Sequence, residues 1–167
     1  MLITAEKDRY FLALAYQHAK KFSSDPRTQN GALLIRPDTM KILSLGANRF
    51  PDGIKHLPER LLPECKREYL EHAERDAIFS AIRQERVIKG AIMYVPWFAC
   101  ADCAKAIIAV GIKAVIGHLA PCMTETVWAE TIKIGLTLLR EANIDYHYYD
   151  GVVGVDNMLF SGQVVNR

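Results

Sequence analysis

The chain has 167 residues, of which 50% are hydrophobic and 24% charged, and a formal net charge of +2. These values are ordinary for a globular protein that buries a real core, so we expect one domain over residues 1–167. A protein that follows a phosphate backbone usually carries clustered basic charge. We therefore expect no nucleic-acid partner, whereas a small anionic ligand fits this balance.

The amino-terminal residues do not resemble a secretory signal, because residues 6–9 are all charged and interrupt any apolar run. No stretch approaches the roughly 18 consecutive apolar residues of a membrane span. The four cysteines then indicate free thiols rather than a disulfide framework. We expect a cytoplasmic protein with no membrane partner.

The elements expected first are a helix and a hairpin. Thr4 is the expected N-cap of the helix, and apolar residues recur at helical spacing over Tyr10–Phe22 until Pro26 ends the run. Two short strands follow at 31–36 and 41–46, joined by a proline-containing turn. This pattern is typical of an antiparallel hairpin.

An irregular, charged stretch over residues 49–71 follows, and loops of this length inside compact domains tend to be functional. Helices and strands then alternate, with expected ranges of Ala73–Gln84 (helix), Ala91–Val95 (strand), Ala101–Val110 (helix), Lys113–Ile116 (strand), Thr124–Glu141 (helix, opened by Thr124 or Glu125) and Asp145–Tyr149 (strand). The alternation predicts an α/β fold, a three-layer α/β/α domain with a mixed five-stranded sheet and one antiparallel edge strand. Ligands of such sheets bind at strand carboxyl ends and helix N-termini.

The residues that carry chemistry lie at two such helix starts. His72 and Glu74 open one predicted helix, and Cys100 and Cys103 open the next. Zinc binds imidazole nitrogen and thiolate sulfur, and a catalytic zinc keeps three protein ligands and one open position. Two cysteines three residues apart can reach one ion, and the positive helix ends favour thiolates. We therefore predict a Zn²⁺ cofactor held by His72, Cys100 and Cys103.

Glu74 is the predicted catalytic residue. A carboxylate beside the metal, but not bound to it, can act as general acid and base. The order His-x-Glu followed by Pro-Cys-x-x-Cys is the signature of the zinc base deaminases, and this chain has the same order with Ala99 in place of the proline. Glu74 would then move protons from the zinc-bound water to the ring nitrogen and to the leaving amine.

Four segments carry a family resemblance. Gly46–Pro51 resembles the motif Gly-Tyr-Asn-Gly-x-Pro, and His72–Ile78 resembles His-Ala-Glu-x-Asn-Ala-Ile. Met93–Ala104 resembles Tyr-Val-Thr…Pro-Cys-x-x-Cys-Ala, and Ala106–Ile112 resembles the helix and turn that follow that motif. Together they resemble the cytidine/deoxycytidylate deaminase superfamily, and within it most the deoxycytidylate (dCMP) deaminases. The resemblance spans about residues 28–118. Departures include Asp76 in place of asparagine, Arg49 in the Gly-Tyr-Asn-Gly-x-Pro loop, and Ala99 in place of the proline before the first cysteine.

The resemblance implies a cytidine-deaminase-like fold, a small-molecule nucleotide substrate and a homo-oligomer. It also implies a zinc-dependent hydrolase that converts dCMP to dUMP and ammonia. Among the site residues, it makes Asn48 a substrate contact, to the sugar, and places the backbone amide of Ala73 beside the pyrimidine edge.

Further substrate contacts remain open between two interpretations. Trp97 and Phe98 either wall the pocket and stack on the base, or belong to the core. Arg49 follows Asn48 and is the first candidate for a 5′-phosphate contact. The other cations of the long loop are either phosphate contacts or solvated side chains, and they are Lys55, Lys66 and Arg67.

Other functions are also compatible with these residues. One is a deaminase of another amino-bearing base: a nucleoside, a 5-modified dCMP or a tRNA adenosine. Another is a non-catalytic, zinc-stabilised binding module. The metal itself could be structural, with Cys65 or Cys122 as fourth ligand, and a second metal could bind His56 and Cys65.

Overall fold

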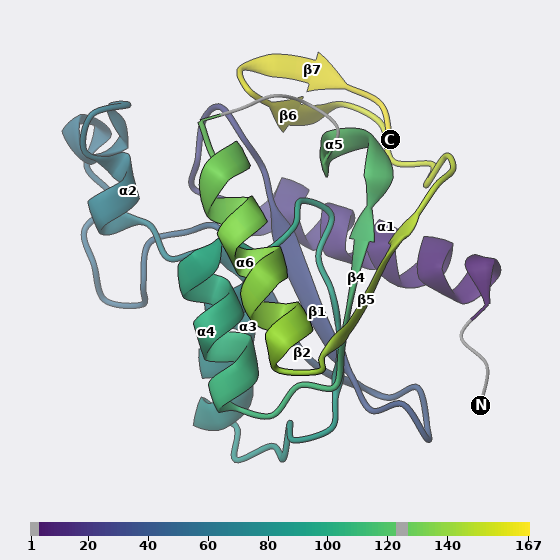
Figure 1. Ribbon diagram of the computed structural model, residues 1–167. Helices are drawn as coiled ribbons and strands as arrows, with labels where there is room; N and C mark the ends of the chain where they lie inside the picture. The colour runs from purple at the N-terminus through teal and green to yellow at the C-terminus, as the bar shows by residue number, and fades with distance from the viewer. Residues whose placement is uncertain (1–3, 123–126) are drawn as a thin grey trace.

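The computed structural model describes residues 4–122 and 127–167 (Figure 1). A five-stranded sheet of order β2-β1-β3-β4-β5 runs through the molecule. Its strands are β1 (Gly31–Ile35), β2 (Ile42–Ala47), β3 (Ile92–Tyr94), β4 (Ala114–His118) and β5 (Asp145–Tyr149). The mixed five-stranded sheet predicted from the sequence is confirmed.

Strand direction differs from the prediction in one respect. β1 pairs antiparallel with both β2 and β3, whereas β3, β4 and β5 pair in parallel. The expected antiparallel edge strand is therefore wrong, since the antiparallel strand is β1 and it lies inside the sheet. The strand order places β1 beside β3 and leaves β2 at the edge.

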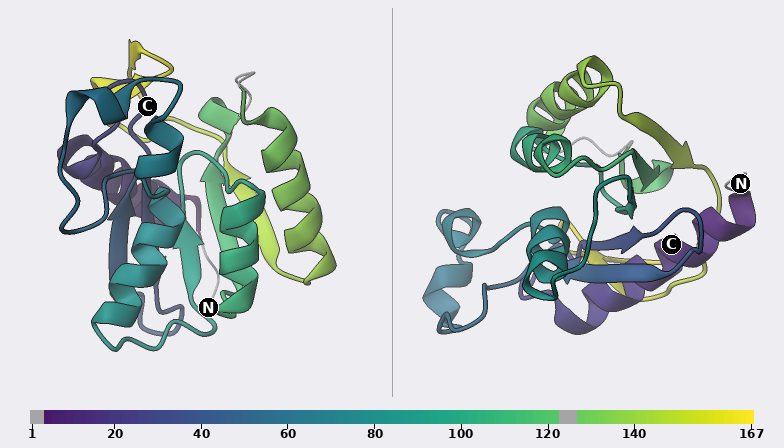
Figure 2. Two further views of the ribbon diagram at one scale, coloured as in Figure 1. Left: turned by 90° about the vertical axis from the view of Figure 1, so that its left-hand side faces the viewer. Right: turned by 90° about the horizontal axis from the view of Figure 1, so that it is seen from below.

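Helices cover both faces of the sheet (Figure 2). The longer ones are α1 (Ala5–Phe22), α3 (Ala73–Arg83), α4 (Ala101–Ala109) and α6 (Ala129–Glu141). α1 packs on one face, and the other three helices pack on the opposite face. Because side chains alternate along a strand, Leu33 and Ile35 face α1 while Leu34 faces the other helices. The three layers are those predicted.

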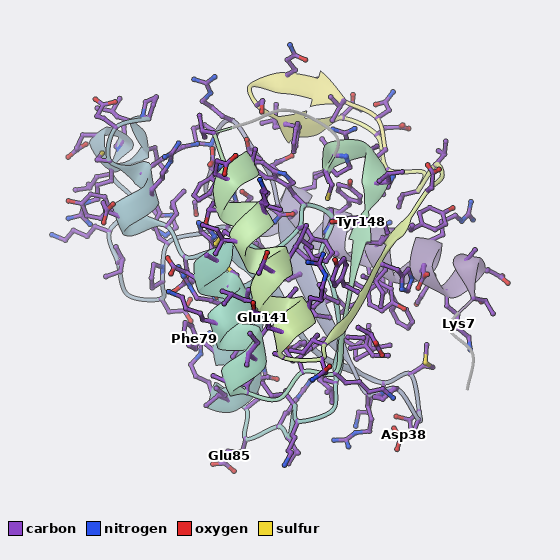
Figure 3. The ribbon with its side chains drawn as sticks, in the orientation of Figure 1. Lys7, Asp38, Phe79, Glu85, Glu141 and Tyr148 are labelled. Atoms are coloured by element: carbon purple, nitrogen blue, oxygen red, sulfur yellow. The ribbon has the colours of Figure 1, made fainter. Side chains whose placement is uncertain are left out.

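α1 begins and ends where the sequence indicates. The hydroxyl of Thr4 accepts a hydrogen bond from the Lys7 amide at 3.4 Å, which satisfies one of the free amides of the first turn. Asp38 and Glu85 project outward at the lower end of the molecule as drawn in Figure 3. In the part of the chain that is described, no helix is both long enough and apolar enough to span a membrane.

Several short elements were not predicted: η1 (Pro58–Leu61), α2 (Lys66–Tyr69), α5 (Leu119–Cys122), β6 (Met158–Phe160) and β7 (Gln163–Val165). Each is too short for hydrophobic periodicity to reveal it. η1 and α2 lie in the stretch expected to be irregular. The last long helix begins at Ala129 rather than Thr124, and both Thr124 and Glu125 lie outside the described residues.

A close approach between β2 and α3 depends on Gly46. A Cβ atom at this position would lie 2.3 Å from the carbonyl oxygen of Ala73 and 2.3 Å from the amide nitrogen of Ala77. Glycine therefore lets the first turn of α3 lie against β2. This contact brings His72 and Glu74 to the end of the sheet where the site forms.

Candidate metal centre and active site

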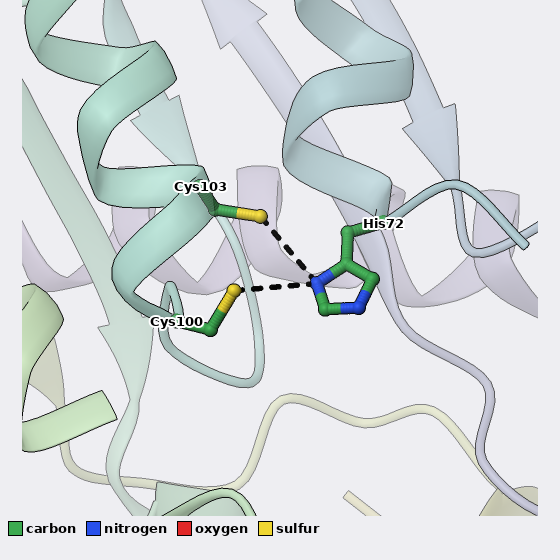
Figure 4. Close-up of side chains that lie close together, drawn as sticks. All are labelled: His72, Cys100 and Cys103. Carbon is green, nitrogen blue, oxygen red and sulfur yellow. Dashed lines mark hydrogen bonds between the residues drawn. The ribbon is translucent and has the colours of Figure 1, made fainter. Parts of the chain in front are cut away.

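Two helix N-termini place the predicted metal ligands side by side. His72 is the N-cap of α3, Cys100 is the N-cap of α4, and Cys103 lies in the first turn of α4. The Nδ1 atom of His72 lies 3.5 Å from the Sγ atom of Cys100 and 3.5 Å from that of Cys103 (Figure 4). All three donor atoms lie within 4.8 Å of one another. We call these residues the His/Cys/Cys cluster.

The donor set fits zinc. Zinc prefers imidazole nitrogen and thiolate sulfur in tetrahedral geometry, and ligands bonded at about 2.0–2.3 Å lie roughly 3.5 Å apart. His72 and Cys100 also line a cavity, so one side of the cluster opens onto it. Three protein ligands and an open side are the arrangement of a catalytic rather than a closed structural zinc site.

The two thiols of the cluster differ in acidity. The hydrogen bond from Cys103 lowers the pKa of Cys100 to about 4, and His72 adds to this effect. The same hydrogen bond, together with burial, raises the pKa of Cys103 well above its usual range. One thiolate is therefore favoured even before a cation arrives, which prepares the cluster for a metal.

The alternative metal sites do not form in the described residues, where the His/Cys/Cys cluster is the one group of metal-ligating side chains. The thiol of Cys65 donates to the carbonyl of Glu59, and that of Cys122 donates to the carbonyl of Pro96. His56 packs against the ring of Phe50. A fourth cysteine ligand and a second metal at His56 and Cys65 are therefore not supported.

Glu74 lies beside the cluster without belonging to it. The residue is 2% exposed, sits in the first turn of α3 and lines the same cavity. Burial raises the pKa of Glu74 to about 6, an effect that His72 opposes. A carboxyl group that titrates near neutrality can both accept and donate a proton.

An aromatic wall connects the cluster to the rest of a cavity of about 390 Å³. Trp128 meets the His72 ring edge-to-face at 5.0 Å between centroids, and Trp97 meets Trp128 at 6.4 Å. Phe98 borders the cavity but is only 3% exposed and packs 4.9 Å from Tyr148, so it belongs mainly to the core. Sequence reasoning missed Trp128, because it fell inside a predicted helix.

Asn48 lines the cavity and also holds its neighbouring segment. Its Oδ1 accepts hydrogen bonds from the Ser23 hydroxyl at 2.6 Å and the Asn30 amide at 2.9 Å, and its Nδ2 donates to the Thr28 carbonyl at 2.6 Å. Among the described residues, the second Nδ2 hydrogen has no hydrogen-bond partner and is left for a ligand, and the predicted substrate contact stays a prediction. Ala73 lines the same cavity.

Arg49 does not occupy the place predicted for it. Its Nε and Nη2 donate to Asp76 at 2.8 and 3.0 Å, and its Nη1 donates to Asp52 at 2.6 Å. It is absent from the residues that line the cavity. Because two carboxylates already engage its guanidinium, the structure does not support Arg49 as a substrate contact.

Other cations line the cavity instead: Arg27, Lys66 and Arg67. The Lys66 ammonium is paired with Asp25 at 2.6 Å, and the Arg67 guanidinium lies 4.8 Å from the centre of the Trp128 ring. The sequence had drawn attention to Lys66 and Arg67. Arg27 was missed, since its surroundings indicated only the end of a helix.

Comparison with known proteins identifies the family to which the chain belongs. The profile described as the cytidine and deoxycytidylate deaminase zinc-binding region matches residues 5–119. Human deoxycytidylate deaminase is 39% identical over 117 residues, which make up 66% of this chain and 64% of the human protein. The probable deoxycytidylate deaminase of Drosophila melanogaster is 32% identical over 123 residues, or 57% of its length. The chain thus spans less than two thirds of these relatives.

Solved structures share the fold. The dCMP deaminase of cyanophage S-TIM5, in complex with dCMP and dUMP, superposes with a TM-score of 0.70 at 21% identity and covers 88% of this chain and 99% of that one. A diaminohydroxyphosphoribosylaminopyrimidine deaminase/reductase from Thermotoga maritima superposes with a TM-score of 0.59 at 22% identity and covers 87% of this chain and 37% of that one. The profile match over most of the chain decides the family: the chain belongs to the cytidine and deoxycytidylate deaminases.

Proposed function

We propose that the protein is a zinc-dependent hydrolase that deaminates a cytosine nucleotide, converting dCMP to dUMP and ammonia. The observation that carries the proposal is the buried carboxylate of Glu74 beside the His/Cys/Cys cluster, at the wall of a ligand-sized cavity. The human and insect relatives named deoxycytidylate deaminase, and the phage enzyme solved with dCMP and dUMP, support the choice of substrate.

The residues of the cavity divide the work. A zinc ion held by the His/Cys/Cys cluster would supply a Lewis acid that makes water nucleophilic near neutral pH. Glu74 accepts a proton from the attacking water and donates it to N3 of the cytosine ring. It then takes the remaining proton of the new C4 hydroxyl group and passes it to the amino group, which leaves C4 as ammonia while the C4 carbonyl forms. Its pKa of about 6 suits this alternation between base and acid. Trp97 and Trp128 present ring edges and faces against which a flat base can pack.

The cations at the cavity favour a nucleotide over a nucleoside. Arg27 and Arg67 are exposed and line the cavity, and neither forms a salt bridge within the described residues. Guanidinium groups bind phosphate through paired charge-assisted hydrogen bonds. We therefore assign the 5′-phosphate to these two arginines, in place of Arg49.

The first test is ammonia release by the zinc-loaded protein from dCMP, 5-substituted dCMP, deoxycytidine, cytosine and dAMP. A clear preference for dCMP or its 5-substituted relative supports the proposal. Activity only on unphosphorylated or purine compounds would keep the deaminase but reject the nucleotide. No activity on any of them would favour an RNA substrate or a non-catalytic binding module.

Replacing Glu74 tests the proton transfer directly. Glu74→Gln keeps the size of the side chain, so the protein should fold and bind one zinc per chain, while kcat falls by about 10³-fold. Glu68→Gln, in the exposed part of α2, is the matched control and should leave kcat unchanged. Zinc content is measured by elemental analysis. An active Glu74→Gln protein would remove Glu74 from the mechanism.

Three further statements belong to the same proposal. We treat residues 1–167 as one deaminase domain, because both hydrophobic cores pack on one sheet. We propose a cytoplasmic location, since all four cysteines are free. We propose a homo-oligomer, in line with the family resemblance, and light scattering of the purified protein tests it.

A further inference from the structure

The C-terminal hairpin formed by β6 and β7 lies beyond residues 5–119, the part of the chain that the family profile matches. It nevertheless reaches the cavity. Ser161, in its turn, lines the cavity, and the ring of Phe160 meets the cavity residue Trp97 edge-to-face at 5.0 Å. Met158 is 1% exposed and anchors the hairpin in the core against α1. Figure 1 shows the hairpin at the end of the molecule where β4 finishes.

The hairpin binds the neighbouring segment through Gln29. The Gln29 amide donates to the carbonyl of Leu159 at 2.8 Å, and the Leu159 amide donates back to Gln29 Oε1 at 3.0 Å. The side chain of Gln29 itself does not line the cavity. Its contacts with β6 can therefore affect a ligand through the residues that precede it in the chain.

Arg27 and Thr28, which precede Gln29, line the cavity, and the hairpin contacts both. The Ser161 amide donates to the hydroxyl of Thr28 at 3.1 Å, and the Gly162 amide donates to the carbonyl of Arg27 at 2.8 Å. On the other side, Asn48 holds the carbonyl of Thr28. Residues 27–29 have no regular structure of their own, so these contacts hold the backbone from which the Arg27 side chain extends.

We propose that the C-terminal hairpin is a positioning element for substrate binding: it fixes residues 27–29, and with them Arg27, and through Phe160 it fixes Trp97. The proposal rests on the proposed nucleotide deaminase function. The hairpin makes its contacts with one wall of the cavity and not with Glu74 or the His/Cys/Cys cluster. Its loss should therefore weaken substrate binding and leave the chemical step intact.

Two substitutions remove the two kinds of contact separately. Gln29→Ala removes the acceptor of the Leu159 amide, and Phe160→Ala removes the ring against Trp97. Each should raise KM for dCMP by roughly 5–10-fold with kcat within about twofold, as expected for the loss of one or two interactions that act on binding. Phe160→Tyr keeps the ring and should restore KM. Val164→Ala, exposed on β7, is the control and should match the wild type.

A second readout does not depend on turnover. Hydrogen exchange of the Gln29 amide should be faster in both alanine variants than in wild type, while zinc content stays at one per chain. Unchanged KM in both alanine variants would overturn the proposal, as would a fall in kcat that parallels a loss of zinc. If wild type itself fails to deaminate dCMP, the proposed function fails and this inference with it. If wild type is active and the variants bind dCMP equally well, only the positioning role fails.

Discussion

Asp76 and Arg49 both differ from the residues expected in the family motifs, and in the structure their side chains form an ion pair. Asp76 stands in place of asparagine and Arg49 in place of glycine, and the two side chains form a forked pair with the Asp76 carboxylate almost fully buried. The same carboxylate accepts the amide of Ala47 at 3.1 Å. The pair therefore links the end of β2 to α3 close to Glu74. Neither motif alone predicts this link, because each contains only one of the two residues.

We expect Asp76→Asn to destabilise the zinc-loaded protein by about 2 kcal/mol, because it removes the buried carboxylate of the forked pair and leaves the Arg49 guanidinium with only the exposed Asp52. Arg49→Ala should cost about 1–2 kcal/mol in wild type but much less when Asp76 is already asparagine. Urea unfolding of the two single variants and the double variant measures the coupling. Additive effects, within about 0.5 kcal/mol, would show that the pair contributes no interaction of its own.

At the scale of the elements, the sequence predicts what is long and periodic. α1, the first hairpin and the alternation from α3 to β5 follow from periodicity and from proline and glycine signals. The inner position of β1 does not, because two strands of a hairpin give no local sign of which one meets the rest of the sheet. Likewise β6 and β7 each have only three residues, and their place is decided by contacts with residues 27–29, far away in the sequence.

Helix α6 closely approaches the start of α4, and hydrophobic periodicity in the sequence does not predict this contact. At Gly135 a Cβ atom would lie 2.5 Å from the carbonyl oxygen of Ala99 and 3.1 Å from that of the metal-ligand candidate Cys100. Glycine in a helix normally costs about 1 kcal/mol relative to alanine. Here the missing side chain lets α6 pack against the start of α4.

We therefore expect Gly135→Ala to lower stability by about 1–3 kcal/mol, since the strain of overpacking exceeds the gain in helix propensity. It should also weaken zinc binding, because the displaced backbone carries Cys100. Thr137→Ala, at an exposed position of the same helix, is the matched control and should be neutral or slightly stabilising. Thermal unfolding by circular dichroism and zinc titration provide the measurements. A Gly135→Ala protein more stable than wild type would contradict the close contact.

At the scale of the whole molecule, the chemical centre is easier to predict than its surroundings. The His/Cys/Cys cluster and Glu74 belong to two short motifs, each at a helix start, and the fold only has to bring two neighbouring helices together. Trp128, Arg27 and Ser161 reach the cavity from separate parts of the chain, so no spacing rule connects them. The pairing of Arg49 is hidden from a spacing rule for the same reason, since its carboxylate partner Asp76 lies 27 residues away in sequence.

His118 joins three parts of the molecule at the end of β4. Its Nε2 donates to the carbonyl of Gly151 at 3.0 Å, and in the neutral ring its Nδ1, 2.7 Å from the hydroxyl of Tyr16 in α1, accepts a hydrogen bond from that hydroxyl. Burial lowers the pKa of His118, with the Gly151 carbonyl opposing the shift, Arg167 adding to it and Asp150 opposing it. The side chain is 2% exposed.

This arrangement predicts a loss of stability in acid. The unfolded chain binds the proton at the ordinary pKa of about 6.5, whereas the folded chain binds it only at lower pH. The contribution of His118 is therefore complete above about pH 6.5 and is lost as the pH falls through the lowered pKa of the folded state. Burial also lowers the pKa of His18, so the titration of His18 adds to the loss of stability in acid. A comparison of wild type with His118→Gln isolates the contribution of His118. We expect His118→Gln to be less stable than wild type at about pH 8, and the difference to shrink towards about pH 5. Thermal unfolding across this range checks it, and a difference that is constant with pH would show that His118 has the same pKa in the folded and unfolded states.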